Sequence, residues 1–505
     1  MPSSVPCPLR NRHAPRIFVR SPAYPGRKCR FDDEFEEQEG PRAEGRSPAE
    51  GDAPSRSPTP ASSRNVSRDR ARLDVTSVPP TSSCRSHAMS SSQPPSPPIP
   101  GLTRRGLLRQ AGAAAGGAAV AGAGGQQAHE DADREAPEEP RIAVPTPQSL
   151  GVEPIINCWG GQTTLGGNLM PPEVLAAMEA ASRSYLVIDE LMDGVGKRLG
   201  ELTGAEWGFV SSGATAAMCA ATCACLAGTD QERMDRLPDT SGMKNEVVVP
   251  ASHRHHYDRG ITMTGVTMVE VDSIAELEAS VGERTCMIAL LGAFLDRPDF
   301  PLEEIVRIGK TKGVPVAVDA AAEEPTSPDR YIEAGVDLVA YSAGKCIRGP
   351  QCAGFLLGRE DLTRAAYAQM SPHLNFGRAM KVGKEEIMGA LTALDLWLNG
   401  RDHEAERVEY FRKIAYIRKE LEDIEGLRLA YRPTRTRANI APRLMIEWDH
   451  AARGKTALEV HHEMLAGTPR IFVRVAGSVL FVHPMMLEPG DEVHVARRLH
   501  EVLAV

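Results

Sequence analysis

The sequence predicts an α/β protein built on a mostly parallel β-sheet with helices on both faces. Two observations support this prediction. Between residues 207 and 357, short apolar runs typical of buried strands alternate with stretches of helical periodicity. Two long amphipathic helices then follow, at 387–398 and 404–421, and the second leads into a smaller α+β region, 427–505. Strands separated by helices are typical of a parallel sheet covered on both faces.

The individual elements follow in order along the chain. Strands are predicted at 207–211, 246–249, 266–270, 286–291, 315–318, 338–341 and 353–357. Helices are predicted at about 213–226, up to 261 and at 302–312. We expect a large domain of the seven-stranded type over residues 152–400 and a small C-terminal domain over 401–505.

Composition and charge limit the possible partners. The chain has 505 residues, of which 42% are hydrophobic and 25% charged, as in a globular protein with room for more than one domain. Residues 1–128 hold 18 Lys+Arg and 11 Asp+Glu, a net of +7, so the total of −9 leaves −16 for residues 129–505. A body this acidic repels a phosphate backbone, which argues against nucleic acid as a partner.

The N-terminal region has the composition of a segment outside the fold. Residues 1–100 are rich in Pro, Ser and Arg, and we predict that they are disordered. Arg104 and Arg105, two leucines and an Ala/Gly run make residues 101–128 resemble a twin-arginine export signal, which predicts an exported or periplasmic protein, the alternative being cytoplasmic. Translation starts at Met1 or at Met89. Residues 129–151 are predicted to be a linker, and no segment is apolar enough to span a membrane.

Four groups of residues follow predicted strands, where ligands of open α/β sheets bind. Ser212, Gly213 and Ala214 stand between a strand and a helix, where small residues and free N–H groups can hold a phosphate, although such a sequence is also an ordinary helix cap. Asp319 ends a buried strand. It is either a turn former or the partner of a pyridine nitrogen, with Ala321 small enough to lie against the ring.

A lysine motif completes this order. Ser342 and Lys345 follow the next strand, and the sequence of phosphate cradle, strand-end Asp and strand-end Lys is the one that a cofactor held as a Schiff base requires. Burial and the neighbouring Arg348 would lower the pKa of the Lys345 amine, and Ser342 would donate to the same phosphate. Arg348 is also a candidate contact of the substrate carboxylate, as are Arg470 and Arg474.

Histidines and cysteines also cluster, and neither cluster predicts a metal site. Three histidines lie between 253 and 256 without suitably spaced metal-binding partners. We predict that one of them stacks on the pyridine ring, and we choose His253 over the alternative, His256, because it is nearest the turn. Cys219, Cys223 and Cys225 match no metal or redox pattern and are expected to be buried packing residues.

These motifs resemble the selenocysteine synthase-like group of fold-type-I pyridoxal 5′-phosphate (PLP) enzymes, which have the aminotransferase class V-like fold. The group contains L-seryl-tRNA(Sec) selenium transferase and D-glucosaminate-6-phosphate ammonia-lyase-like proteins. The similarity begins at 155–157 and 165–174, continues through 189–206, and is most specific at 342–351, which is nearer the ammonia-lyase-like branch. Met485 departs from the pattern, because relatives often have an arginine there.

The resemblance implies Lys345 as the Schiff-base residue and Asp319 as the partner of the pyridine nitrogen. It also implies that Ser212, Gly213, Ala214 and Ser342 surround the phosphate, and that the protein is a homodimer or a larger homo-oligomer. The implied activity is a PLP-dependent lyase reaction on an amino acid or amino-sugar acid through a Lys345 aldimine. The alternatives are L-seryl-tRNA(Sec) selenium transfer, an aminotransferase-type activity, and a non-catalytic PLP-binding relative.

Overall fold

The structure is a computed structural model that describes residues 142–434 and 436–504. The predicted disordered region, 1–100, the twin-arginine segment, 101–128, and most of the predicted linker lie outside the described residues. In the part that is described, no helix is both long and apolar enough to cross a membrane.

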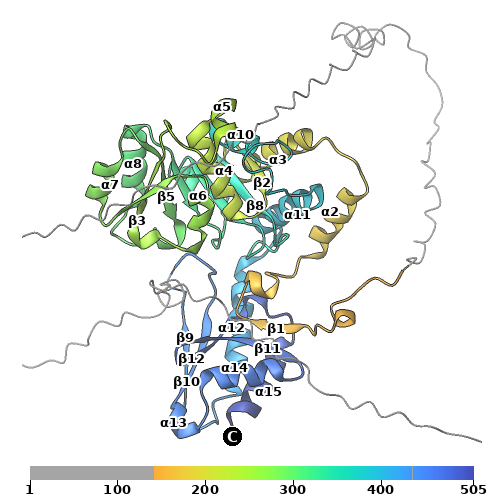
Figure 1. Ribbon diagram of the computed structural model, residues 1–505. Coiled ribbons are helices and arrows are strands. Elements are labelled where there is room, and N and C mark those ends of the chain that lie inside the picture. Colours follow the sequence, from red (N-terminus) through yellow and green to blue (C-terminus); the bar gives the residue numbers. More distant parts are fainter. Residues whose placement is uncertain (1–141, 435, 505) are drawn as a thin grey trace, which may run out of the picture. The chain divides into compact units, whose positions relative to one another are not determined.

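The larger domain is built on a seven-stranded sheet (Figure 1). In spatial order its strands are β2 (Trp207–Ser211), β8 (Gly354–Gly358), β7 (Leu338–Ser342), β6 (Val316–Asp319), β5 (Thr285–Leu291), β3 (Glu246–Pro250) and β4 (Thr267–Val271). Only β8 runs antiparallel to its neighbours, and the other paired strands are parallel. The predicted mostly parallel, seven-stranded sheet is therefore confirmed.

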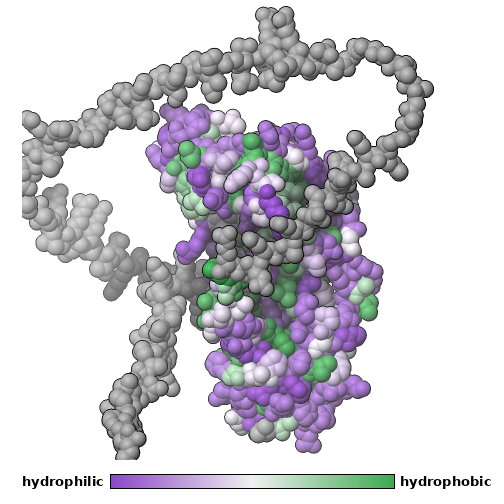
Figure 2. Space-filling model, turned by 90° about the vertical axis from the view of Figure 1, so that its right-hand side faces the viewer, coloured by the Kyte–Doolittle hydropathy of each residue, from purple (hydrophilic) through white to green (hydrophobic). Residues whose placement is uncertain are grey.

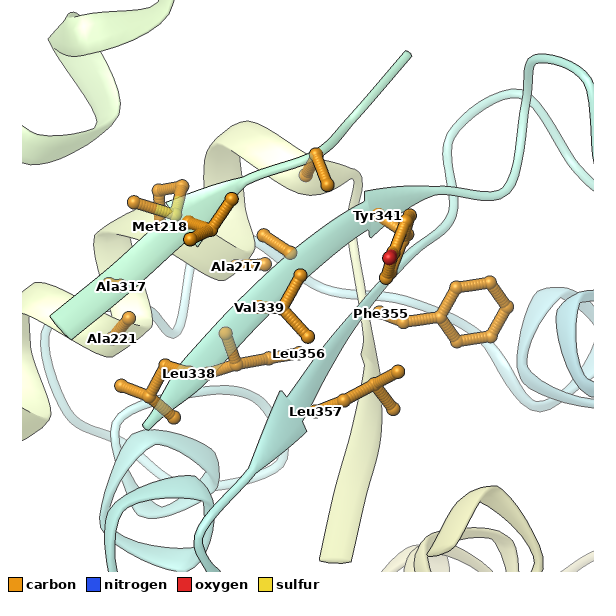
Figure 3. Packing of buried hydrophobic residues seen from close by; sticks show 14 of the residues in the cluster. Ala217, Met218, Ala221, Ala317, Leu338, Val339, Tyr341, Phe355, Leu356 and Leu357 are labelled. Carbon is orange, nitrogen blue, oxygen red and sulfur yellow. The ribbon is translucent and has the colours of Figure 1, made fainter. Parts of the chain in front are cut away.

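Helices cover this sheet. α4 (Ala214–Ala227) packs across the central strands, and almost every residue in it is buried. Its small side chains allow close approach, so that Ala217 and Ala221 share one core cluster with Ala317 of β6 and Val339 of β7 (Figure 3). The other helices of this domain are α2 (Pro172–Ser182), α3 (Ile188–Thr203), α5 (Gln231–Arg236), α6 (Arg259–Thr262), α7 (Ile274–Ser280), α8 (Leu302–Lys312), α9 (Arg330–Glu333), α10 (Glu360–Ala368) and α11 (Lys384–Asp395).

A second, five-stranded sheet forms the core of the smaller domain. Its strands lie in the order β1 (Ile155–Cys158), β11 (Arg470–Ala476), β12 (Val479–Val482), β10 (Arg443–Trp448) and β9 (Leu427–Arg432). Its helices are α12 (His403–Lys419), α13 (His450–Arg453), α14 (Ala457–Ala466) and α15 (Asp491–Leu503).

The placement of β1 differs from the predicted domain division. Residues 152–400 were expected to form the large domain, yet β1 pairs in parallel with β11 of the smaller sheet. Its residue Cys158 is fully buried in the core of that sheet, and Ile156 packs against the same cluster. The smaller domain is thus completed by a strand from the start of the described chain.

Candidate active site

The sheet topology brings the predicted site residues to one edge. Because β2, β7, β6, β5 and β3 are mutually parallel, their carboxyl ends share that edge. Asp319 is the last residue of β6 and is paired with Ala340 of β7, and Lys345 lies just beyond the end of β7. This is where ligands bind in open α/β sheets.

A cavity opens at this edge and contains about 1030 Å³ of empty space, including solvent at its mouth. Asp319, Ala321 and Lys345 all line it. The smaller domain contributes Arg443 and Arg474 to the same lining. The presence of the amine and the carboxylate in one cavity agrees with the sequence-based expectation.

The side chain of Lys345 is half-buried and lines the cavity. Its burial lowers the pKa of Lys345, and the negative charge of Asp319 acts in the opposite direction. A lowered pKa leaves a larger share of the amine neutral at physiological pH, and the neutral amine is the nucleophilic and basic form.

Asp319 is held by its own turn and faces a histidine. Its Oδ1 accepts a hydrogen bond from the backbone N–H of Ala321 at 3.0 Å. Its Oδ2 lies 3.9 Å from Nε2 of His255. The side chain therefore has a fixed position in the cavity lining, with 6% of the residue exposed.

The histidine that lines the cavity is His255, and the prediction of His253 is corrected. His253 is buried between the rings of Phe294 and Phe300, and its Nδ1 accepts from the backbone N–H of Leu291 at 3.2 Å. Burial lowers the pKa of His253 to about 4, so the ring stays neutral. The ring of His253 points into the core because the chain enters a short 3-10 turn, Ala251–His253, directly after β3.

The predicted phosphate cradle lies along the same edge but does not line the cavity. Ser211 of β2 and Ser342 of β7 both pair with Gly354 of β8, which places the start of α4 and the end of β7 on either side of that glycine. A Cβ at Gly354 would stand 2.6 Å from the backbone nitrogen of Ala214, so only glycine fits there. The 212–214 turn, with Gly213 at φ 94°, presents the first N–H groups of α4.

The arginine assignments change. Arg348 does not line the cavity. It adopts a left-handed backbone at φ 62° and its guanidinium donates to Glu488 at 2.6 Å. Arg470 donates to two backbone carbonyl oxygens, those of Leu465 and Glu153. Arg474 alone of the three candidates lines the cavity, where it is joined by Arg443. Strand alternation puts Arg470 and Arg474 on the same face of β11, so it does not separate these two candidates. No sequence pattern singles out Arg443.

A second acidic residue of the cavity was also missed. Glu323 follows β6, is 2% exposed and lines the cavity. Its Oε2 accepts a hydrogen bond from the hydroxyl of Tyr331 at 2.6 Å. In the sequence, Glu323 stands beside Glu324 in an ordinary polar turn, so nothing marks it as buried.

Comparison with known proteins agrees with this geometry. The sequence model of the aminotransferase class-V family matches residues 277–442. A 5′-C-glycyluridine monooxygenase-decarboxylase from Streptomyces sp is 35% identical over 374 residues, which cover 70% of this chain and 91% of the relative. The chain belongs to the selenocysteine synthase-like family of fold-type-I PLP enzymes.

Two further comparisons support this family. A D-glucosaminate-6-phosphate ammonia lyase from Salmonella typhimurium is 28% identical, over 70% of this chain and 97% of the relative. A solved structure of D-glucosaminate-6-phosphate ammonia-lyase superposes with a TM-score of 0.62 at 27% identity, covering 72% of this chain and 99% of the other.

The cofactor of this enzyme is PLP, and the cavity residues fit it. Lys345 offers a buried amine, Asp319 a carboxylate for the pyridine nitrogen, and Ala321 a side chain small enough to lie against a ring. The N-terminus of α4 offers N–H groups for the phosphate.

Proposed function

We propose that the protein is a PLP-dependent lyase that acts on an amino acid or an amino-sugar acid. The observation that carries the proposal is the cavity itself, in which the amine of Lys345 and the carboxylate of Asp319 stand together with two arginines from the smaller domain. PLP supplies an electron sink that stabilises negative charge at the substrate Cα.

Each of these residues has a distinct task in the proposed reaction. Lys345 holds the cofactor and then acts as the general base at Cα, because burial favours its neutral amine. Asp319 keeps a proton on the pyridine nitrogen. Ser212, Gly213, Ala214 and Ser342 bind the phosphate, and the ring of His255 lies beside the cofactor. These assignments are proposals that rest on the positions of the residues at one sheet edge.

The two arginines indicate an anionic substrate. Arg443 comes from β10 and Arg474 from β11, and both side chains reach the cavity. Guanidinium groups bind carboxylates and phosphates through paired hydrogen bonds. The relative named D-glucosaminate-6-phosphate ammonia lyase supports a substrate that carries such groups.

The test is a visible spectrum of the purified protein, wild type against Lys345→Ala, followed by a screen of amino acids and phosphorylated amino-sugar acids for ammonia and keto-acid release. We expect an absorption band of bound cofactor that is lost in the variant, and release of ammonia from at least one acidic substrate. A wild-type protein that binds PLP without perturbing its spectrum contradicts the proposal.

A second candidate is an oxygen-consuming decarboxylation, favoured by the 35% identity to the monooxygenase-decarboxylase. The two reactions share Lys345 and Asp319 but differ in what they consume and release. An oxygen electrode combined with carbon dioxide detection distinguishes them, because the lyase reaction consumes no oxygen.

Homodimers or larger assemblies are part of the proposal. Exposed apolar side chains follow one another in the segment before α3, at Tyr185, Leu186 and Val187, and Leu175 in the first turn of α2 is exposed as well. Figure 2 shows green hydrophobic patches among mostly hydrophilic side chains on one face. Apolar clusters of this kind favour contact with a second copy. Light scattering of the wild type and of Tyr185→Ser tests this, and a monomeric wild type contradicts it.

Export through the twin-arginine route also remains a proposal. It is supported by Arg104 and Arg105 ahead of the Ala/Gly run. Replacing both arginines by lysine should retain the protein in the cytoplasmic fraction. Recovery of the native protein only from that fraction contradicts export.

A further inference from the structure

Glu323 is held in the cavity by two parts of the chain. Its backbone N–H donates to the carbonyl oxygen of Ala320 at 2.9 Å, which closes the turn after β6. It also forms an isolated antiparallel bridge with Ala438, and the N–H of Asn439 donates to Ala322 at 2.8 Å. The turn therefore connects the edge of the large sheet to the segment that leads into β10.

The carboxyl group of Glu323 has a defined position, set by Tyr331 and Gly292. Oε2 accepts from the hydroxyl of Tyr331, while Oε1 is buried and has no hydrogen-bond partner among the described residues. A Cβ at Gly292 would stand 1.8 Å from Oε1, so the absence of a side chain there creates the space for this oxygen. A buried polar atom without a partner costs stability and therefore requires an explanation, of which a catalytic role is one. Because Glu323 lines the cavity, a group bound there can supply the missing partner.

The surroundings of Glu323 keep part of its carboxyl groups protonated at neutral pH. Burial raises the pKa of Glu323 to about 7, and the charge of Asp319 adds to this. The hydrogen bond from Tyr331 and the charges of Arg437 and Arg330 act in the opposite direction. Burial also raises the pKa of Tyr331, which therefore remains a donor to Oε2. The proton of the neutral carboxyl then resides on Oε1.

We propose that Glu323 is the general acid that protonates the group departing from Cβ of the substrate. The inference rests on the proposed lyase function and assigns it a second acid–base residue. Lys345 takes the proton from Cα, and the electron pair of that C–H bond forms a double bond between Cα and Cβ. The bond between Cβ and a hydroxyl oxygen breaks with its electron pair on oxygen, and Oε1–H of Glu323 transfers its proton to that oxygen. Water leaves. The proton that Lys345 took from Cα then returns to Glu323 across the cavity, which restores the neutral carboxyl.

Leaving groups of different basicity test the role directly. Hydroxide needs a proton to leave, whereas chloride does not. In Glu323→Gln we expect elimination from serine or D-glucosaminate 6-phosphate to fall by roughly 100-fold or more, the usual size of a general-acid contribution. Elimination from β-chloroalanine should change by less than about tenfold, because no proton transfer to chloride is needed. Equal losses with both kinds of substrate overturn the proposal.

The neighbouring carboxyl provides a matched control. Glu324 pairs with Arg407 at 3.3 Å and does not line the cavity, so Glu324→Gln should retain both eliminations. Infrared difference spectra of the holoenzyme across a pH titration add a readout independent of turnover. We expect a protonated-carboxyl band that disappears as pH rises through about 7, present in wild type and Glu324→Gln and absent in Glu323→Gln. A wild type without that band overturns the proposal.

Exchange of the substrate Cα hydrogen separates this inference from the lyase proposal. Exchange of the Cα hydrogen with solvent requires the base, Lys345, but not Glu323. A substrate labelled with deuterium at Cα should therefore still lose its label to solvent in Glu323→Gln. If the wild type itself shows neither exchange nor elimination, the lyase function fails. If Glu323→Gln loses exchange as well as elimination, Glu323 has a structural role and only the inference fails.

Discussion

Nε2 of His255 lies 3.9 Å from Oδ2 of Asp319 and 3.3 Å from Oδ1 of Asp258. Nδ1 of the same ring accepts from the backbone N–H of Tyr257 at 3.3 Å, so the ring hydrogen of neutral His255 is on Nε2, between the two carboxylates. Asp258 is in turn bound by Nε of Arg254 at 2.5 Å. The His255 ring therefore lies between the carboxylate assigned to the cofactor nitrogen and Asp258, which is itself paired with Arg254.

Replacing His255 with Ala should weaken PLP binding by about tenfold, because the cavity loses the ring that lies beside Asp319. The measurement is a PLP titration followed by absorbance. His256, on the same turn, is exposed and does not line the cavity, so His256→Ala is the control and should bind PLP as the wild type does. A greater loss in the control would contradict the assignment of His255.

Arg474→Ala should raise KM for an anionic substrate by roughly 10- to 100-fold, the range expected for hydrogen bonds to a charged group. Arg348 is instead paired with Glu488 outside the cavity lining. Arg348→Ala is expected to leave KM within about threefold, because its guanidinium is bound to Glu488 and does not reach the substrate. Steady-state kinetics over a range of substrate concentrations checks both variants.

Lys345→Met should stabilise the apoprotein. Burial lowers the pKa of Lys345 in the folded state. The unfolded chain therefore binds more protons between the folded pKa and the ordinary value of 10.5, and stability rises with pH through that window. The variant lacks this dependence. Urea denaturation of both apoproteins at several pH values provides the test, and identical slopes against pH would contradict the burial of the amine.

Acidification should destabilise the protein through His253. Its folded pKa of about 4 is below the ordinary 6.5, so the unfolded state binds more protons between those values. Stability is then complete above pH 6.5 and falls as pH decreases toward 4, by at most about 1.4 kcal/mol per pH unit for one group. His253→Asn keeps an acceptor for the N–H of Leu291 and should reduce the slope, whereas His256→Asn should not.

Gly292→Ala should cost about 1–3 kcal/mol of stability, the usual cost of overpacking. The added Cβ would meet the carboxyl of Glu323 and the hydroxyl of Tyr331. Glu323→Ala removes the carboxyl that the new Cβ at residue 292 would meet. In a double-mutant cycle the effects of Gly292→Ala and Glu323→Ala on stability should therefore not be additive. Additive losses in thermal unfolding would contradict the contact.

The sequence predicted the large sheet well because its signals are local. Each predicted strand from 207 to 357 agrees with the structure to within a residue or two, and the 302–312 helix agrees at both ends. Buried parallel strands are continuous apolar runs, which a short window reveals. Asp319 and Lys345 were predictable because they directly follow two such runs that are neighbours in the sheet.

The remaining site residues depend on long-range packing. His253 ends the 3-10 turn Ala251–His253, whereas His255 caps the next one, His256–Asp258, and only this local geometry decides which ring enters the core. Arg443 reaches the cavity because the smaller sheet packs beside the larger one, and Glu323 is buried by Gly292 and Tyr331 from separate elements. β1 pairs with a strand more than three hundred residues away, and no sequence window contains both.

That pairing also constrains how the protein is made. β1 is synthesised before the whole large domain, while its partner β11 and the closing helix α15 are synthesised last. The first strand must therefore remain unpaired on the ribosome until almost the full chain has emerged. A nascent or prematurely terminated product exposes this edge, where a chaperone or another nascent chain can pair with it.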